Sequence, residues 1–412
     1  MSARRCRSQV SDTRLRWRRW IVAGLLIVAA AWCLDQRLFL ARYGSYLLAG
    51  YDPLTVPVSW FKPVYALAEA PAVDLPAAQA ATIPAAALAA AADYAEAQGS
   101  IALLVARGGR VELERYWSGF DGDDLFNPQS MSKTVLALVL GIAIADGAIN
   151  SVDDAIGTYL DEWRDDPRGA ITIGQLLQMS GGLAQLATDY TPVPWSPAVW
   201  QHFGTDFNKA IFTLAQADAP GTHWDYNNNE TNLLGIVIER ATGRSYQAYL
   251  AEKLWQPLQL GPALMYLDQP GGNVMKSCCI LSRPQAWLKL GQLMLDRGRY
   301  GGQQLVPAAW IDAMLRPAET NPGYGYQVWL GDGSLWDIAA EPPPPEVYTW
   351  WGSEPYAADD IYTFVGHGYQ SVWVIPSQEL VIVRGTRSWS AERWDTSRIP
   401  NTLVRALAPQ AD

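Results

Sequence analysis

A serine and a lysine three residues apart, Ser130 and Lys133, have the types and spacing needed for acyl-transfer chemistry. They precede the apolar run 135–140, which is typical of a buried helix, and positions i and i+3 of a helix share one face. We therefore expect the Lys133 amine to reach the Ser130 hydroxyl and to act as its base. Free N–H groups and the positive dipole end of the helix would favour a developing oxyanion and a neutral amine. An N-capping serine followed by a surface lysine is the alternative.

The same spacing occurs once more among the six lysines of the chain, at Ser59 and Lys62. Pro63 follows Lys62 and disfavours a helical backbone there, so these two side chains are not expected to share a helix face. Because the spacing recurs by chance, further motifs must decide which serine is chemically active.

A second group of polar residues, Tyr226 and Asn228, lies between two helical stretches. A tyrosine hydroxyl near the lysine can carry the serine proton to a leaving group, and an amide two residues later can orient the lysine and a substrate carbonyl. The alternative is a polar turn, because asparagine-rich runs favour turns.

A third group begins at Gly366 and includes His367 and Gln370, at the start of a predicted strand. Glycines in such a strand let a substrate backbone approach closely. A single histidine before glycine is more often structural than catalytic, so this segment carries weight only together with the other two.

In this order the three groups resemble the motifs of the serine β-lactamase and penicillin-recognising family, which are S-x-x-K, Y-x-N and a K-T-G or H-x-G strand. The resemblance extends to residues 171–183, 233–243 and 252–258, and it covers roughly residues 85–405. Residues 366–370 and 374–376 are similar to the third-motif strand of class C-like esterases and 6-aminohexanoate-dimer hydrolases.

The resemblance implies an acyl-enzyme mechanism, with Ser130 as nucleophile, Lys133 as base, and Tyr226 as proton shuttle beside Asn228. It also implies an oxyanion hole made by the Ser130 N–H and an N–H of the third strand. If His367 occupies the first position of the third motif, that second donor is Gln370. Tyr369 stands where the motif has glycine, which leaves the register of this strand open by one residue.

The elements that must position these groups follow from hydrophobic patterning. We expect a helix over 84–98, a β-hairpin around Gly108 and Gly109, helices from 133 to about 315, and a last helix through 403–404. Strands are expected at 324–330, 361–365, 371–375 and 380–384. This order predicts an α+β (α/β) fold of the β-lactamase/transpeptidase type: an antiparallel sheet flanked by helices, plus a mostly helical subdomain. The proline-rich residues 341–356 are expected to form a loop that overhangs a site with Trp350 and Trp351.

Charge and composition exclude several classes of function. The net charge is −10, and because residues 1–19 carry +6 the remaining body carries −16, which makes a nucleic-acid partner unfavourable. Three histidines without an H-E-x-x-H pair suggest no metal site, and no cofactor is expected. Adjacent Cys278 and Cys279 can form a vicinal bridge, but we predict two buried thiols.

The N-terminus combines seven arginines with an uncharged apolar run at 20–34. This pattern predicts a cytoplasmic basic tail over 1–19, a transmembrane signal anchor over 20–40, an extended stalk over 41–80 and a serine hydrolase domain over 81–412. The catalytic domain would then lie on the periplasmic side of the cell inner membrane. A cleaved secretory signal is the alternative.

Together these features predict a membrane-anchored serine hydrolase that acts on a small-molecule amide or ester through an acyl-enzyme on Ser130. A G-x-S-x-G elbow does not occur in the sequence, which disfavours other serine hydrolase folds. A β-lactamase, a D-Ala-D-Ala carboxypeptidase and a non-hydrolytic penicillin-binding-type sensor remain alternatives. His367 is mostly neutral at pH 7, unlike the lysine of β-lactamases, which favours uncharged substrates.

Overall fold

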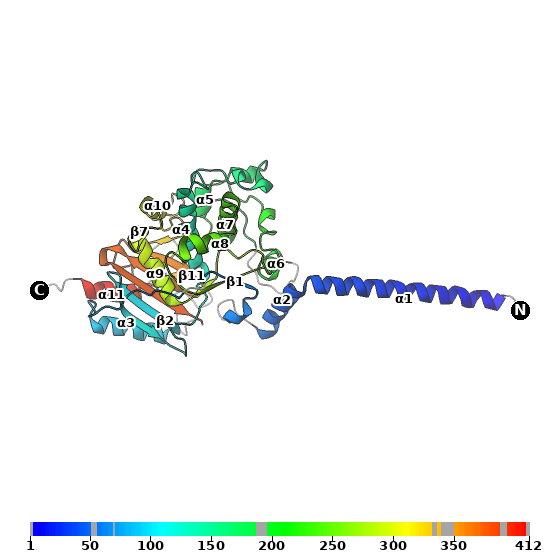
Figure 1. The fold of residues 1–412 in the computed structure, drawn as a ribbon, viewed down its shortest axis with the longest axis horizontal. Coiled ribbons are helices and arrows are strands. Elements are labelled where there is room, and N and C mark those ends of the chain that lie inside the picture. The colour runs from blue at the N-terminus through cyan, green and yellow to red at the C-terminus, as the bar shows by residue number, and fades with distance from the viewer. Residues whose placement is uncertain are drawn as a thin grey trace.

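The computed structural model describes residues 3–50, 56–68, 71–186, 196–331, 336–338, 350–387 and 394–408. Figure 1 shows a body of strands and helices from which one long N-terminal helix, α1 (Ala3–Asp35), projects. An antiparallel sheet with helices on its faces lies beside a mostly helical region, so the predicted fold class is confirmed.

The main sheet is six-stranded, in the order β3-β2-β13-β12-β11-β8, and each pair in it is antiparallel. The last strand of the chain pairs with the first strand of this sheet, so early and late segments close it as the pattern predicts. The strands are β2 (Ser100–Arg107), β3 (Arg110–Tyr116), β8 (Trp329–Leu330), β11 (Tyr362–Gly366), β12 (Gln370–Ile375) and β13 (Leu380–Thr386).

The β2–β3 hairpin turns at Gly108 and Gly109, whose φ angles are +54° and +72°. A two-residue turn with positive φ at both positions matches the twist of the flanking strands, and glycine adopts it without steric cost. Strand formers on both sides of a Gly-Gly pair were therefore sufficient to predict this hairpin.

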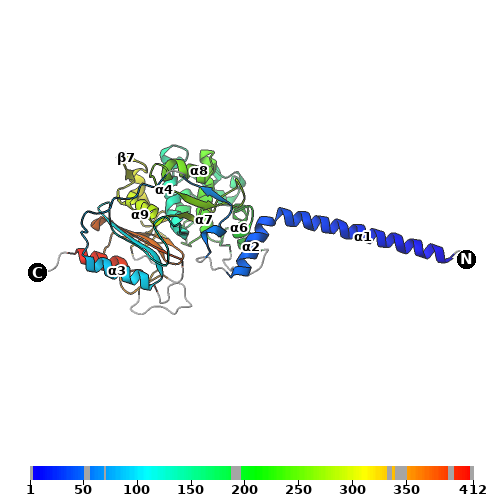
Figure 2. The same cartoon turned by 60° about the horizontal axis from the view of Figure 1, so that its bottom comes forward.

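Both faces of the sheet are covered by helices. The first face packs against α3 (Ala85–Ala97) and α11 (Arg398–Leu407), and the second against α9 (Pro284–Leu295), as Figure 2 shows for α3 and α9. Alternate residues along each strand point to opposite faces. Strands β2, β11, β12 and β13 are buried on both faces, whereas the edge strand β3 has exposed residues. Leu103, Val105, Trp373 and Ile382 belong to the first core, and Leu104, Val372, Val374 and Val383 to the second.

The helical region holds the segments that resemble the family between its first two motifs. Its helices are α4 (Ser132–Ala145), α5 (Ile173–Leu177), α6 (Pro197–Phe203), α7 (Asn228–Thr242), α8 (Tyr246–Leu250) and α10 (Ala308–Met314). Smaller sheets pair β1 (Val64–Ala66), β4 (Ala263–Tyr266) and β5 (Ile280–Ser282), then β6 (Arg299–Tyr300) with β7 (Gln303–Gln304), then β9 (Trp336–Ile338) with β10 (Trp350–Gly352).

Helix α4 is the buried element that the apolar run 135–140 predicts. Its residues from Ser132 to Ala143 are all buried, and Trp310 of α10 packs on it. A Cβ at Gly141 would lie 2.1 Å from Trp310 Cδ1, so only glycine leaves room for this ring. The indole Nε1 of Trp310 donates to the Ala137 carbonyl at 2.9 Å. Such packing holds α4 rigidly beneath the site.

The segment 341–356, expected to be a loop, contains a short strand in the part that the structure describes. Residues 341–349 lie outside the described residues, and Trp350–Gly352 forms β10. Trp351 is buried, and its carbonyl accepts hydrogen bonds from the Thr396 backbone N and Oγ1 at 3.0 and 2.8 Å. The backbone of β10 is therefore joined to the C-terminal segment, and burial of Trp351 removes its apolar surface from water.

The segment 41–80 also differs from the extended stalk predicted for it. Helix α2 (Arg37–Ala49) packs Phe39 and Tyr43 against Val199 and Phe203 of α6, and β1 pairs with β4. In Figure 1 α2 lies against the body at the point where α1 departs. Proline content indicated an extended chain here, but the aromatic residues between the prolines supply apolar surface that packs on the domain.

Arg42 on α2 strengthens this attachment. Its buried guanidinium donates to the carbonyls of Gly204, Leu267 and Asp268 at 2.9, 2.9 and 2.8 Å, and to that of Lys62 at 3.0 Å. Its neighbours come from three distant parts of the chain. Helix α2 thus forms part of the folded body, and among the described residues α1 is the element that extends from it.

Candidate active site

Ser130 and Lys133 meet where a short turn enters α4. Ser130 lies in the 3₁₀ turn η2 (Gln129–Met131), and Lys133 lies in the first turn of α4. The Lys133 Nζ and Ser130 Oγ are 3.0 Å apart, as the three-residue spacing predicts. By contrast, Ser59 and Lys62 are both exposed and no helix joins them.

Two further oxygen atoms surround the Lys133 amine. Its Nζ donates to Asn228 Oδ1 at 2.7 Å and to the backbone carbonyl of Ser277 at 2.8 Å. All three partners are uncharged, and the side chain is 1% exposed. Because burial without a charged partner disfavours an ammonium ion, it lowers the pKa of Lys133 to about 7. A large fraction of the amines is then neutral and able to accept a proton at physiological pH.

Tyr226 also contacts the serine. Its side chain is hydrogen-bonded to that of Ser130, and Lys133 Nζ lies 5.1 Å from the centre of its ring. Burial raises the pKa of Tyr226, so the hydroxyl keeps its proton at neutral pH. A protonated phenol in contact with the nucleophile can donate a proton to a departing group and take one back.

An aromatic cluster that sequence reasoning missed supports Tyr226. Trp329 of β8 stacks on it with centroids 5.8 Å apart, and Tyr324 and Trp224 pack against both rings. The sequence predicts a strand over 324–330 and gives no sign that its aromatic residues meet Tyr226. Their sequence distance from Tyr226 is about a hundred residues, so no local pattern links them to the site.

The asparagine run divides between turn and site. Asn227 caps α7, since its Oδ1 accepts from the Asn229 N at 3.0 Å and its Nδ2 donates to the Leu183 carbonyl at 2.9 Å. Asn228 is the first residue of α7 and contacts Lys133. Asn227 thus has the structural role of a polar turn. The contact of Asn228 is compatible with its predicted role in orienting Lys133.

Glu230, two residues further along α7, joins the family-like segment 171–183 to this helix. It is buried and accepts a hydrogen bond from the Gly181 N at 3.1 Å. Burial raises the pKa of Glu230 to about 8, so its carboxyl is largely protonated at pH 7. A Cβ at Gly181 would lie 2.8 Å from its Oε1, which leaves room for glycine only. The contact holds the start of α7 in place.

The third motif forms the β11–β12 hairpin, and His367 lies in its turn. Gly366 ends β11 opposite Gln370 of β12, and a Cβ at Gly366 would lie 2.1 Å from the Pro128 carbonyl. In the described residues β8 pairs with β11 at Tyr362 and Thr363, which leaves the last residues of β11 without a strand on that side. Strand β11 contacts η2. This open end of β11 is the part of the sheet next to Ser130.

Gln370 is the first residue of β12, and its side chain is buried. Its side chain is fully buried, donates to the Thr386 carbonyl at 2.7 Å and accepts from the Thr386 N at 2.9 Å. Because β12 lies between β11 and β13, the Gln370 backbone is in the sheet interior. These contacts are made by the Gln370 side chain, so the oxyanion role of its backbone N–H stays a prediction.

Arginines near the third motif have structural partners. The buried Arg384 donates to Ser100 Oγ and to the carbonyls of Gly368 and Tyr369, at 2.8, 3.1 and 3.0 Å. Arg387 donates to the Leu125 carbonyl at 2.9 Å.

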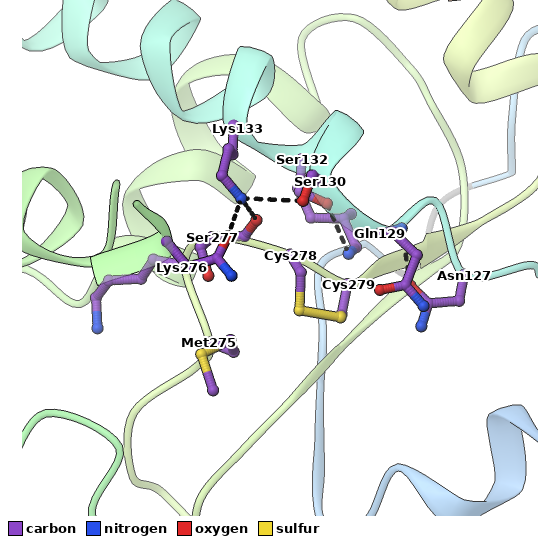
Figure 3. The surroundings of a disulfide bond; sticks show 12 residues. Asn127, Gln129, Ser130, Ser132, Lys133, Met275, Lys276, Ser277, Cys278 and Cys279 are labelled. Carbon is purple, nitrogen blue, oxygen red and sulfur yellow. Dashed lines mark hydrogen bonds between the residues drawn. A yellow bond between two sulfur atoms is a disulfide. The ribbon is translucent and has the colours of Figure 1, made fainter. Parts of the chain in front are cut away.

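Cys278 and Cys279 form a disulfide beside the site, which corrects the prediction of two thiols. Neighbouring residues of a strand point to opposite faces, but Cys279 has a φ of +75°, and this left-handed backbone breaks the alternation. Figure 3 shows the disulfide next to Ser130 and Gln129, with Ser277 and its contact to Lys133 on the other side. Sequence reasoning weighed the bridge, but it missed the Ser277 carbonyl.

The profile of the beta-lactamase family matches residues 85–398, which span the sheet, α4, α7 and the β11–β12 hairpin. The chain belongs to the beta-lactamase family. It is a serine hydrolase of amide or ester bonds, as the resemblance implied.

Among curated members of this family, the 6-aminohexanoate-dimer hydrolase of Paenarthrobacter ureafaciens is 28% identical over 311 residues, which are 70% of this chain and 72% of that protein. The D-aminopeptidase of Brucella canis is 29% identical over 40% of this chain and 33% of its own length. A penicillin-binding protein homologue from Caulobacter crescentus superposes with a TM-score of 0.60 at 15% identity, covering 79% of this chain and 99% of its own.

Proposed function

We propose that this protein is a membrane-anchored hydrolase that cleaves a small amide or ester through an acyl-enzyme on Ser130. The contact of 3.0 Å between the Ser130 hydroxyl and a buried amine whose pKa is about 7 carries this proposal. A neutral lysine can remove the serine proton without a second base, which is the requirement for a nucleophilic serine.

In the proposed acylation, Ser130 Oγ attacks the substrate carbonyl carbon while its proton passes to Lys133 Nζ. The tetrahedral intermediate collapses when Tyr226 donates its proton to the leaving amine or alcohol, and the proton on Lys133 restores the phenol. Asn228 accepts a hydrogen bond from the Lys133 amine and so holds this base beside Ser130. A water molecule then attacks the acyl carbon, and the carboxylic acid departs as Oγ regains a proton.

Stabilisation of the oxyanion is assigned to two backbone N–H groups, that of Ser130 and one at the His367 end of β11. The close approach of Gly366 to the Pro128 carbonyl supports this pairing, because it brings the end of β11 against the turn that carries Ser130. Donors fixed by a sheet and a helix start need no reorganisation during the reaction.

The membrane part of the proposal rests on α1. Residues Trp17–Asp35 form a helical segment of mean hydropathy 1.5, long and apolar enough to cross a membrane. The arginines before it orient the N-terminus to the cytoplasm, so the hydrolase domain would lie on the periplasmic side of the inner membrane. The attachment of α2 to the domain then keeps the active site close to the bilayer surface.

Two experiments test this proposal. The full chain, reconstituted in phosphatidylcholine vesicles, is expected to hydrolyse p-nitrophenyl acetate, and a fluorophosphonate is expected to label Ser130. Absence of both would refute a hydrolytic function and favour a binding protein or sensor.

For the anchor, protease added to intact spheroplasts is expected to digest the domain, and carbonate washing is expected to leave the protein in the membrane. A freely soluble mature form that begins near Trp32 would show a cleaved signal instead.

A further inference from the structure

A pocket of about 110 Å³ lies beside the catalytic residues and has no part in the mechanism above. Asn127, Gln129, Cys278 and Cys279 form its inner wall. Gln129 directly precedes the nucleophile, and Cys278 directly follows the residue whose carbonyl holds Lys133. Figure 3 shows these four side chains gathered on one side of Ser130. The inner end of the pocket is therefore formed by residues next to Ser130 and to the Ser277 carbonyl.

Aromatic rings from the membrane-proximal segment form the outer wall of this pocket. Tyr46 comes from α2, Trp60 from η1 (Val58–Trp60) and Phe203 from α6. The Phe203 ring lies 5.1 Å from that of Tyr46 and 5.8 Å from that of Trp60, measured between centroids. Trp60 Nε1 donates to Ser45 Oγ at 2.9 Å, which satisfies its polar atom and leaves an apolar ring for the pocket.

Chemistry and position both indicate what this pocket holds. Most of the lining is apolar, and it consists of aromatic rings, Met275 and the disulfide, with His202 and the amides of Asn127 and Gln129 as its polar groups. Such a lining offers dispersion contacts to an alkyl chain. Tyr226, the proposed donor to the leaving group, lies instead in the cluster with Trp224, Tyr324 and Trp329. Tyr226 does not line the pocket, so a leaving group beside Tyr226 leaves the acyl group free to extend toward Gln129 and Cys278.

We propose that this pocket binds the apolar acyl chain of the substrate, so that the physiological substrate is an amide or ester of a short aliphatic acid. The inference rests on the proposed acyl-enzyme on Ser130. Helix α2 follows the membrane helix and also lines the pocket. The alkyl chain of an amphiphilic substrate at the bilayer surface would therefore lie close to the pocket.

The test is a chain-length series of p-nitrophenyl esters, from acetyl to octanoyl, with the full chain in phosphatidylcholine vesicles. Vesicles replace detergent because detergent chains would compete for an apolar pocket. Each methylene buried in the pocket is expected to raise kcat/KM about fourfold, so that the pentanoyl ester exceeds the acetyl ester by about 60-fold.

Half-buried Tyr46 provides the variants, and exposed Leu47 on the same helix provides the matched control. Tyr46→Ala widens the pocket and is expected to move the optimum to longer acyl chains, whereas Tyr46→Trp narrows it and is expected to move the optimum to shorter ones. Leu47→Ala and Leu47→Trp should keep the wild-type profile. Thermal unfolding checks that each variant is folded.

The outcomes separate this inference from the proposed function. Acetyl hydrolysis that requires Ser130, combined with a chain-length profile that is flat or equally shifted by the Tyr46 and Leu47 substitutions, would overturn the pocket assignment alone. Absence of any hydrolysis that requires Ser130 would refute the proposed function and the pocket assignment together. A longer optimal acyl chain in Tyr46→Ala and a shorter one in Tyr46→Trp, with the wild-type optimum kept in both Leu47 variants, would establish the acyl pocket.

Discussion

Asn228→Asp places a carboxylate where an amide oxygen now contacts the Lys133 amine at 2.7 Å, and it should move the pH dependence of catalysis. In the native site, burial lowers the pKa of Lys133 from 10.5 to about 7. At pH 7 about half of the amines are then neutral, compared with about one in 3,000 for an exposed lysine. We expect kcat/KM for p-nitrophenyl acetate to rise about tenfold per unit below pH 7 and to level off above it.

The introduced charge favours the ammonium form of Lys133. At 2.7 Å the attraction between unit charges is about 1.5 kcal/mol even at the dielectric constant of water, which corresponds to about one pKa unit, and a partly buried pair gains more. Asn228→Asp should therefore move the acid limb upward by about 1–3 units. Its activity should be low at pH 7 and should recover between about pH 8 and 10.

The control is Asn228→Ala, which removes the same hydrogen bond without adding a charge. This variant should lower kcat/KM but should not move the acid limb upward. The assay is stopped-flow hydrolysis from pH 5 to 10, corrected for spontaneous ester cleavage. An acid limb at the same pH in the wild type and in Asn228→Asp would show that Lys133 is not the base, and a wild-type limb near pH 10 would show that burial does not lower its pKa.

Four further predictions follow from the same geometry. Ser130→Ala should abolish hydrolysis and fluorophosphonate labelling while Ser59→Ala keeps both; loss of activity in Ser59→Ala alone would reverse the assignment. Tyr226→Phe should lower kcat at least about 100-fold, the usual scale for a general acid–base group, and an unchanged kcat would remove the phenol from the mechanism. The folded pKa of Glu230, about 8, lies above its unfolded value of 4.5, so its contribution to stability is complete below pH 4.5 and is lost as the pH rises through 8. Glu230→Gln should therefore gain up to about 5 kcal/mol of unfolding free energy relative to the wild type between pH 4.5 and 8 in urea titrations, and a constant difference across this range would contradict the shift. An uncharged acyl ester should exceed a penicillin in kcat/KM by at least about 100-fold in parallel assays at pH 7, and efficient cephalosporin turnover without esterase activity would make β-lactamase the better name.

These assays need the full chain. A fragment beginning at residue 80 would lack β1, which pairs with β4, and α2, whose Arg42 donates to carbonyls of the domain. Removing them would expose Phe203 and Tyr266, which now pack against residues of that segment. Stability or specificity lost in such a fragment would then report on the missing segment and not on the catalytic residues.

Local features of this protein were predictable from the sequence because each depends on residues close together in the chain. Gly108 and Gly109 specify their hairpin by backbone freedom, and the apolar run after Lys133 specifies a buried helix. The three-residue spacing of Ser130 and Lys133 brings hydroxyl and amine to 3.0 Å once that helix forms. Motif order along the chain then indicated the family.

Tertiary structure decided what depends on the pairing of distant segments. Asn228 and Ser277 lie 95 and 144 residues from Lys133, and their oxygen atoms converge on its amine only because α7 and the residues before β5 pack beside α4. Burial of the amine is a property of that packing, and so is its lowered pKa. The same holds for α2, where prolines suggested a stalk, and for Gln370, which lies inside the sheet because β12 has a neighbour on each side. Periodicity tells which face of an element is apolar, but it does not tell which other element covers that face.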